Sequence, residues 1–151
     1  MLLIDVNDIK KLIQKVGLKF FYEKLIIQLE NDFANWDDFE KVPRVAAHSP
    51  IGVIELMPIS NKEFYAYKYV NGHPQNPKFN KLTVMATGAL SITKTGEPLC
   101  IAEMTILTAL RTGATSALAG KYLAKKDSTV LTLIGTGAQS EFQSLAFSVL
   151  F

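Results

Sequence analysis

Cysteine is almost absent from this sequence: Cys100 is the single one, so no intrachain disulfide can form. That excludes the disulfide-stapled folds typical of small secreted proteins. Cys100 lies in the apolar run Pro98–Ala102, where a small buried side chain is more common than a nucleophile. We therefore expect a protein of a reducing compartment, the cytoplasm.

Long hydrophobic runs are also missing. The apolar residues Met1–Ile4 end at Asp5, which makes the stretch too short for a signal peptide. No other run approaches the roughly 20 apolar residues that a membrane-spanning helix needs. We expect no membrane association.

A strong excess of charge of one sign is absent as well. The formal net charge is +2, and the lysines are scattered rather than gathered in a basic stripe with interleaved aromatics. We therefore expect no nucleic-acid partner. The two histidines, His48 and His73, are too few and too far apart in the sequence to suggest a metal site.

What the sequence does have is apolar residues. They make up 48% of the 151 residues, and the mean hydropathy is +0.17, which lies at the apolar end for a soluble protein. The length is sufficient for one domain with a substantial core. The high apolar content indicates buried interfaces, partner segments that are not in this sequence, or both.

The spacing of these apolar residues predicts an α+β arrangement followed by the start of an α/β unit. Helical spacing brings one set of side chains to a common face, and we expect these as core: Phe21, Leu25, Ile26, Leu29 and Phe33. The predicted helices are 5–16, a second from residue 18, 105–124 and a last one after Gly137. The predicted strands are 1–4, 44–48, 52–57, 64–70, 83–92, 98–102 and 129–134, with a loop at 71–77.

Charged residues interrupt the apolar strands. Alternation puts Lys68 on the same strand face as Phe64 and Val70, and puts Tyr65, Tyr67 and Tyr69 on the other. One face must carry the core, and alternation alone does not decide which. A core face is one interpretation of the tyrosine side.

Burying an unpaired charge costs several kcal/mol, on the order of 3–5, so each such residue requires a counter-ion. One interpretation pairs Glu55 internally with Lys68 or Arg111. The other is an anion pocket: Arg44, Lys68 and Arg111 outnumber Glu55, and an external carboxylate would complete the set, with arginine supplying bidentate geometry.

A Gly-x-Gly turn, Gly135-Thr-Gly137, stands between the predicted strand 129–134 and the last helix. Alone this is a weak signal, and Ser140 takes the place of the third glycine of the usual dinucleotide fingerprint. The strand–turn–helix context favours a cofactor, because backbone N–H groups at a helix N-terminus can bind a pyrophosphate.

Several stretches together resemble the ornithine cyclodeaminase/mu-crystallin family, and its cyclodeaminase branch in particular. The resemblance covers nearly the whole chain and is carried by 44–49, 52–58, 67–74, 83–86, 103–106, 109–116 and 134–143. Within these, 109–116 reads ALRTGATS and 134–143 reads IGTGAQSEFQ, which are general to the family. The stretches around Glu55 and His73 are more specific to the cyclodeaminase branch.

The resemblance implies roles for individual residues. It implies that Glu55 and Lys68 are catalytic. The residues it implies for substrate binding are Arg44, Met57, Lys68 and Arg111, the cations binding the substrate carboxylate and Met57 lying with Glu55 near the amino group. The residues it implies for NAD binding are Thr83, Arg111, Gly135, Gly137, Ala138 and Gln139.

The activity implied by the resemblance is conversion of L-ornithine to L-proline and ammonia, with NAD⁺ accepting the α-hydride and later returning it. The alternatives are a related NAD(P)-dependent imine reductase or amino-acid dehydrogenase, and a mu-crystallin-like ligand-binding protein. The family forms homodimers through its N-terminal sheet, which makes the tyrosine side a candidate interface.

The resemblance also implies a division of the chain. Residues 1–128 would form a substrate-binding and dimerisation domain, and 129–151 the first strand, turn and helix of a Rossmann domain. Family members are roughly twice this length, as a substrate domain plus a whole Rossmann domain requires. We therefore expect an N-terminal fragment, inactive alone, with the family's catalytic aspartate beyond Phe151.

Overall fold

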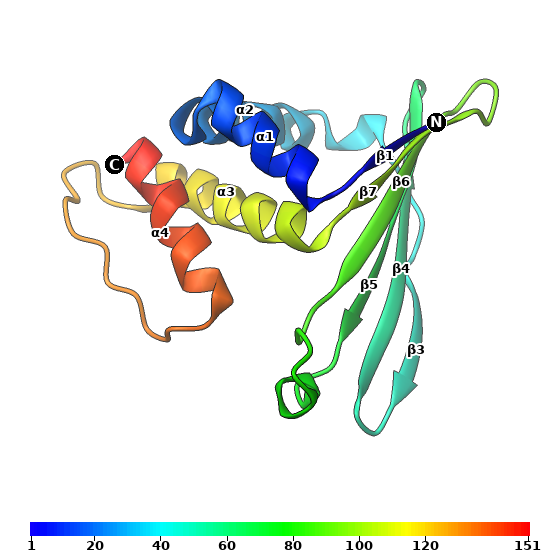
Figure 1. Cartoon of the computed structure of the whole chain (residues 1–151). Helices are drawn as coiled ribbons and strands as arrows, with labels where there is room; N and C mark the ends of the chain where they lie inside the picture. Colours follow the sequence, from blue (N-terminus) through cyan, green and yellow to red (C-terminus); the bar gives the residue numbers. More distant parts are fainter. The chain divides into compact units, whose positions relative to one another are not determined.

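A computed structural model describes all residues from 1 to 151. The chain divides into two compact units, a sheet unit and a helical unit (Figure 1). The sheet unit comprises Met1–Val6 and Asp37–Thr105, and the helical unit comprises Asn7–Trp36 and Ile106–Phe151. None of the helices combines the length and the apolar character needed to cross a membrane.

The sheet unit is built on one mixed seven-stranded sheet. Its strands are β1 (Leu2–Ile4), β2 (Glu40–Lys41), β3 (Val45–Ser49), β4 (Gly52–Ser60), β5 (Phe64–Gly72), β6 (Ala86–Ile92) and β7 (Pro98–Glu103). The order is β1-β7-β6-β5-β4-β2, and β3 also pairs with β4. Only the β1–β7 pairing is parallel, so the sheet consists mostly of antiparallel neighbours joined by short connections.

The register of β4 and β5 sorts their side chains onto two faces. Lys68 lies opposite Met57, and Tyr69 lies opposite Leu56. Because neighbours across a pair point the same way, one face carries Met57 and Lys68 and is called here the cation face. The other carries Leu56 and the tyrosines of β5 and is called the tyrosine face.

The tyrosine face is not the core of the sheet unit. Tyr65, Tyr69 and Leu56 are 39%, 41% and 38% exposed. On the cation face, by contrast, Val70 is buried. The alternation predicted from the sequence is confirmed, and of the two interpretations left open for the tyrosines, the core interpretation is wrong.

The helices are α1 (Val6–Val16), α2 (Leu18–Ala34), α3 (Thr105–Leu123) and α4 (Ala138–Leu150). The helical unit contains α2 and α4 whole, and α1 and α3 without their first residues, which belong to the sheet unit. A short 3₁₀ turn, η1 (Trp36–Asp38), begins at the end of this unit. The predicted helices therefore form, and α1 ends before Gly17, whose φ of 83° suits glycine. The buried apolar side chains of this unit are Ile9, Tyr22, Ile26, Leu29, Leu110, Ala114, Ala117, Leu118 and Ala146.

A close approach of α3 and α4 defines the centre of this core. A Cβ atom added to Gly113 would stand 2.5 Å from the carbonyl oxygen of Phe142. That same oxygen accepts a 3.3 Å hydrogen bond from the hydroxyl of Tyr22 on α2. Burial, and secondarily the charge of Glu141, raises the pKa of Tyr22 to about 12. The three helices thus meet where a glycine leaves room for backbone.

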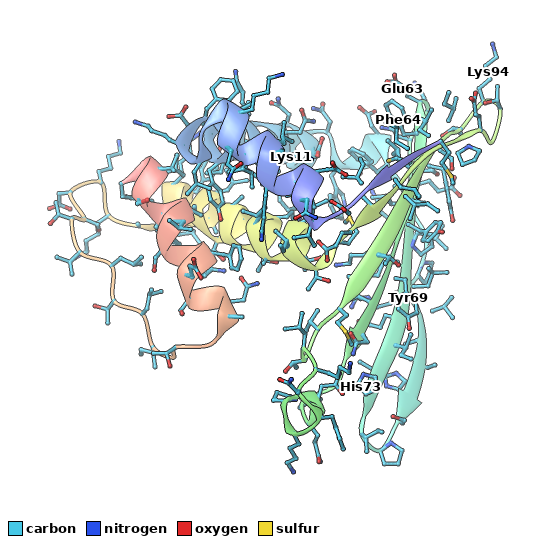
Figure 2. All side chains as sticks on the ribbon, in the orientation of Figure 1. Lys11, Glu63, Phe64, Tyr69, His73 and Lys94 are labelled. Atoms are coloured by element: carbon cyan, nitrogen blue, oxygen red, sulfur yellow. The ribbon has the colours of Figure 1, made fainter.

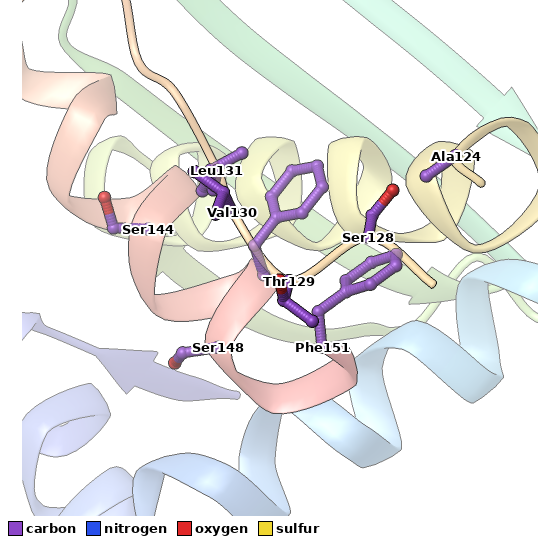
Figure 3. Close-up of a pocket in the computed structure, with 9 residues that line it drawn as sticks. Ala124, Ser128, Thr129, Val130, Leu131, Ser144, Ser148 and Phe151 are labelled. Atoms are coloured by element: carbon purple, nitrogen blue, oxygen red, sulfur yellow. The ribbon is translucent and has the colours of Figure 1, made fainter. Parts of the chain in front are cut away.

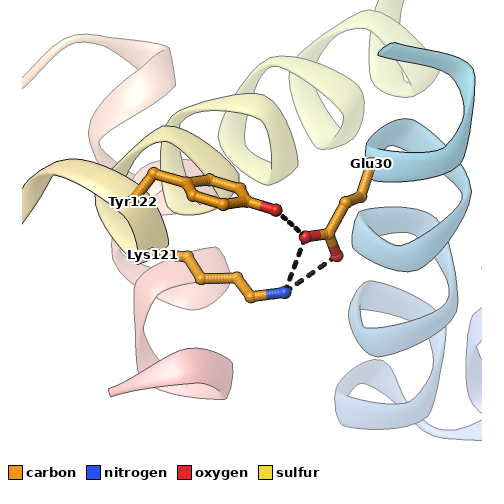
Figure 4. Close-up of polar contacts among 3 residues, drawn as sticks. All are labelled: Glu30, Lys121 and Tyr122. Carbon is orange, nitrogen blue, oxygen red and sulfur yellow. Dashed lines mark hydrogen bonds and ion pairs between the residues drawn. The ribbon is translucent and has the colours of Figure 1, made fainter. Parts of the chain in front are cut away.

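A polar cluster joins α2 and α3 at another point (Figure 4). The ammonium of Lys121 lies 2.8 Å from both carboxylate oxygens of Glu30, and the hydroxyl of Tyr122 donates to the same carboxylate. The hydrogen bond from Lys121, followed by that from Tyr122, lowers the pKa of Glu30.

The expected core of α2 is partly wrong. Tyr22, which periodicity did not single out, is the side chain with no exposed surface, while Phe33 is 43% exposed. The ring of Phe33 stacks on that of Trp36 with centroids 5.8 Å apart, near the end of the helix. Helical spacing gives the face of a helix, but it does not say where along its length the partner helices make contact.

The predicted strand at 129–134 is also wrong, since these residues adopt no regular structure. Val130 is 83% exposed and Ile134 fully exposed. A strand exists only through hydrogen bonds to a neighbour, and none of the seven strands pairs with this segment. The helix predicted after Gly137 does form, as α4. The domain division at 128/129 stays a prediction.

The segment before α4 packs on that helix around an apolar cavity of about 300 Å³ (Figure 3). Val130 and Leu131 line it from that segment, and Phe147 of α4 and Phe151, just after the helix, also line it. The hydrophobic character of 129–134, which suggested a strand, is thus used in part for packing against a helix.

Candidate functional site

Arg44 and Glu55 form an ion pair at the cation face. The guanidinium Nη1 of Arg44, just before β3, lies 3.0 Å from a carboxylate oxygen of Glu55 on β4. The Arg44 side chain is 62% exposed and that of Glu55 is 21% exposed. A pair this open to water contributes at most about 1 kcal/mol to stability. Arginine carries five N–H donors in a planar fork, so this contact leaves others for a ligand.

Lys68 and Met57 complete the group on the same face. They are directly opposite one another on β5 and β4, and both are half-buried. Glu55 is two residues from Met57 on the same strand and therefore points the same way. Three neighbouring strands thus bring together four of the residues predicted for the site: Arg44, Glu55, Met57 and Lys68.

The structure pairs Glu55 with Arg44, a partner that the sequence analysis does not propose for it. The pair joins β3 to β4, whose register sets Ala46 opposite Glu55, and this register could not be read from alternation alone. Arg111 is an exposed residue of α3 and belongs to the helical unit.

Thr83 belongs to the sheet unit but not to a strand. β6 begins at Ala86, three residues later than predicted, so Thr83 lies in the connection from β5. Its side chain is exposed, while its carbonyl oxygen accepts a 2.9 Å hydrogen bond from the backbone N–H of His73. The backbone of Thr83 is thus fixed by a hydrogen bond, while its side chain remains accessible to solvent.

The glycine turn lies at the start of α4. Gly135 has φ 103°, in the region that favours glycine, and Gly137 is the N-cap of the helix, with no side-chain capping hydrogen bond. All residues from Gly135 to Gln139 are exposed. The first N–H groups of a helix without such a cap are open to an anion, which fits a phosphate-bearing cofactor.

Asn71 is a residue that the sequence analysis missed. It was assigned to a loop, but β5 continues through it to Gly72, and its side chain is 8% exposed. Together with Tyr69 and His73 it lines a cavity of about 270 Å³, and Figure 2 places Tyr69 and His73 along β5 and its end. The sequence signal that could have found it is the position of Asn71, which continues the alternation of the strand before it. No group of three or more metal-binding side chains is close enough together to hold a metal.

Comparison with known proteins gives consistent relationships. The model of the ornithine cyclodeaminase/mu-crystallin family matches residues 6–151. An ornithine cyclodeaminase of Agrobacterium fabrum is 54% identical over 147 residues, which are 97% of this chain and 42% of that protein.

Solved structures agree. A lysine cyclodeaminase, described in its recognition of L-lysine, L-ornithine and L-2,4-diaminobutyric acid, superposes with a TM-score of 0.86 at 32% identity, covering 97% of this chain and 45% of the other. An archaeal alanine dehydrogenase dimer with bound NAD superposes with a TM-score of 0.84 at 32% identity, covering 100% and 46%. The chain thus spans less than half the length of the proteins that it matches.

Proposed function

The chain belongs to the ornithine cyclodeaminase/mu-crystallin family, and we propose that the whole protein converts L-ornithine to L-proline and ammonia with bound NAD. The observation that carries this proposal is the gathering of Arg44, Glu55, Met57 and Lys68 on one face of the sheet. The 54% identity to an ornithine cyclodeaminase supports the choice of substrate.

Arg44 and Lys68 bind the substrate carboxylate in this proposal, together with Arg111. A carboxylate accepts parallel hydrogen bonds from a guanidinium, and a half-buried ammonium adds a charge-assisted contact. Binding one end of the amino acid fixes the position of its α-carbon, which is the atom that reacts.

Glu55 and Met57 face the α-amino group. Glu55 is the base that takes a proton from that amine, because Arg44 fixes the position of its carboxylate on the same face as the substrate. The thioether of Met57 supplies an apolar wall opposite Lys68. Lys68 stabilises the negative end of the substrate while the charge on the amine changes, which is its catalytic role.

NAD is the proposed cofactor, and when bound it supplies an acceptor for the α-hydride that can also return it. Gly135, Gly137, Ala138 and Gln139 bind its phosphates through the open N-terminus of α4. Thr83 and Arg111 contact it nearer the substrate. Binding of NAD by a structurally similar alanine dehydrogenase supports this cofactor.

A homodimer formed through the tyrosine face is part of the same proposal. Several apolar side chains are exposed there, at Leu56, Tyr65 and Tyr69 among others, and exposed apolar patches mark interaction surfaces. The similar alanine dehydrogenase is a dimer. We also propose a cytoplasmic location, which a single unpaired cysteine supports.

An amino-acid dehydrogenase is the second candidate, favoured by the likeness to alanine dehydrogenase. Incubating the full-length protein with L-ornithine and NAD⁺ separates the two. A cyclodeaminase forms proline and ammonia in equal amounts without net NADH, whereas a dehydrogenase accumulates NADH. Binding of both ligands without turnover would instead indicate a mu-crystallin-like role.

A further inference from the structure

Asn71 forms two hydrogen bonds with the backbone of Met85. Its side-chain oxygen accepts the N–H of Met85 at 2.6 Å, and its own backbone N–H donates to the carbonyl of Met85 at 3.1 Å. Asn71 is buried, and a buried amide whose partners were removed would cost about 1–3 kcal/mol. The contact therefore extends the pairing of β5 to residues that precede β6.

The amide nitrogen of Asn71 reaches His73 and Thr83. It lies 2.9 Å from the ring nitrogen Nδ1 of His73 and 3.5 Å from the carbonyl oxygen of Thr83. Since the side-chain oxygen of Asn71 already accepts from Met85, the amide nitrogen must be the donor. Nδ1 of His73 is then the acceptor, which assigns the proton of a neutral ring to Nε2.

Other residues also fix the position of His73. A Cβ atom added to Gly52 would stand 2.7 Å from the ring, so the first residue of β4 packs directly against it. The backbone of His73 donates to the carbonyl of Thr83 at 2.9 Å, and Asn76 donates to the carbonyl of Leu82 at 2.9 Å. Figure 2 shows His73 where β5 leads into the following loop.

We propose that Asn71 and His73 are positioning residues that fix the backbone of Leu82–Met85 and thereby aim the exposed side chain of Thr83 at the cofactor. This inference rests on the proposed function, which assigns Thr83 to NAD. Neither residue touches a ligand in this account. They act through four hydrogen bonds to the backbone of Thr83 and Met85: Met85 to Asn71, Asn71 to Met85, Asn71 to Thr83, and His73 to Thr83. A fifth, from Asn71 to His73, links the two side chains.

Two variants of His73 test the proposal in the full-length protein. His73→Leu removes the acceptor for Asn71, while His73→Asn keeps a side-chain oxygen near the place of Nδ1. Lys78→Ala is the matched control, because Lys78 lies on the same loop and its ammonium donates a hydrogen bond to the side chain of Gln75, away from Asn71 and His73 in sequence. The readouts are the Kd for NAD⁺, KM and kcat with ornithine, and hydrogen exchange of the amides of 82–86.

The expected result for His73→Leu is a Kd for NAD⁺ raised about tenfold, as a misplaced contact residue predicts, with faster exchange at Met85. His73→Asn and Lys78→Ala should stay within about twofold of the unchanged protein. A merely structural role would lower the melting temperature of His73→Leu without changing Kd.

The two proposals fail in different ways. The positioning role is overturned if His73→Leu leaves hydrogen exchange at Met85 unchanged. It is also overturned if exchange becomes faster but the Kd for NAD⁺ stays the same. In both cases, activity of the protein without substitutions still supports the proposed function. An unchanged protein that neither binds NAD⁺ nor consumes ornithine contradicts the proposed function, and the positioning role falls with it whatever the exchange at Met85.

Discussion

Arg44 and Glu55 are joined by a 3.0 Å ion pair between a residue just before β3 and a residue of β4. This pair orients a guanidinium and a carboxylate on the face of the sheet that also carries Met57 and Lys68. Because the arginine is largely exposed, the pair contributes little to folding. In the proposed function, the pair orients these two groups for the substrate.

Replacing Arg44 should therefore separate activity from stability. We expect Arg44→Ala to raise KM for ornithine at least about tenfold, because a charge-assisted carboxylate contact is worth roughly 1.5–3 kcal/mol. The melting temperature should change by no more than a few degrees. Steady-state kinetics and a thermal melt on the same preparation measure both.

Lys94→Ala is the control, since Lys94 is exposed in the turn between β6 and β7. Arg44→Lys should recover only part of the affinity, because an ammonium cannot form the bidentate contact. An unchanged KM in Arg44→Ala would remove this residue from the carboxylate site.

Gly113 is predicted to be irreplaceable in α3. Alanine favours helices over glycine by about 1 kcal/mol, but its Cβ would overlap the carbonyl oxygen of Phe142, at 2.5 Å. Since backbone cannot rotate away, we expect Gly113→Ala to destabilise the chain by about 1–3 kcal/mol. Chemical denaturation measures the free energy of unfolding.

Gly120→Ala is the matched variant on the same helix. Its Cβ would meet the ring of Phe147 at 2.7 Å, and a side chain can shift where backbone cannot. We expect a smaller loss than at Gly113. Equal losses would mean that α3 and α4 do not meet through the backbone at Gly113.

Tyr22 should make stability depend on alkaline pH. Its pKa is raised to about 12 in the folded chain, against about 10 in the unfolded chain. The contribution of the neutral phenol is fully present below pH 10 and is lost as the pH rises from about 10 to 12, because the unfolded chain releases the proton first. Denaturation series at pH 7, 10 and 12 measure this.

Tyr22→Phe removes the titrating group. It should cost about 0.5–1.5 kcal/mol at pH 7 through the lost hydrogen bond to Phe142, and its stability should fall less between pH 10 and 12 than that of the unchanged chain. Parallel curves for the two proteins would show that Tyr22 is not protected from ionisation by burial.

Leu56 lies opposite Tyr69 on the tyrosine face and tests the proposed dimer. A lysine there would place a charge within an apolar interface, so we expect Leu56→Lys to dissociate the full-length dimer while leaving its monomers folded. Sedimentation velocity and far-UV circular dichroism measure the two properties.

Ile51→Lys is the control, because Ile51 is an exposed apolar residue in the turn between β3 and β4. It should leave the dimer intact. A Leu56→Lys protein that still sediments as a dimer would locate the interface elsewhere.

The sequence predicted best those features that depend only on the spacing of side chains along one strand or helix. The two faces of β5 followed from alternation, and the residues around Lys68 were placed correctly. The pairing of Arg44 with Glu55 depends on the register between β3 and β4, which is set by contacts between segments.

The failures have the same origin. Residues 129–134 have a strand composition, but a strand needs a partner, and none lies beside them. Asn71 was predicted in a loop because polar residues are uncommon inside a strand, yet its side-chain oxygen accepts the backbone N–H of Met85 in place of a backbone carbonyl. Both outcomes depend on neighbours that are distant in sequence.

The central claim is that an amino acid held by its carboxylate on the cation face loses its α-hydrogen as hydride and recovers it. Incubating the full-length protein with L-ornithine deuterated at the α-carbon and with NAD⁺ tests this most directly, with products read by mass spectrometry. We expect proline that retains deuterium at its α-carbon, one ammonia per proline and no net NADH. Accumulation of deuterated NADH, or proline that has lost the label, would contradict it.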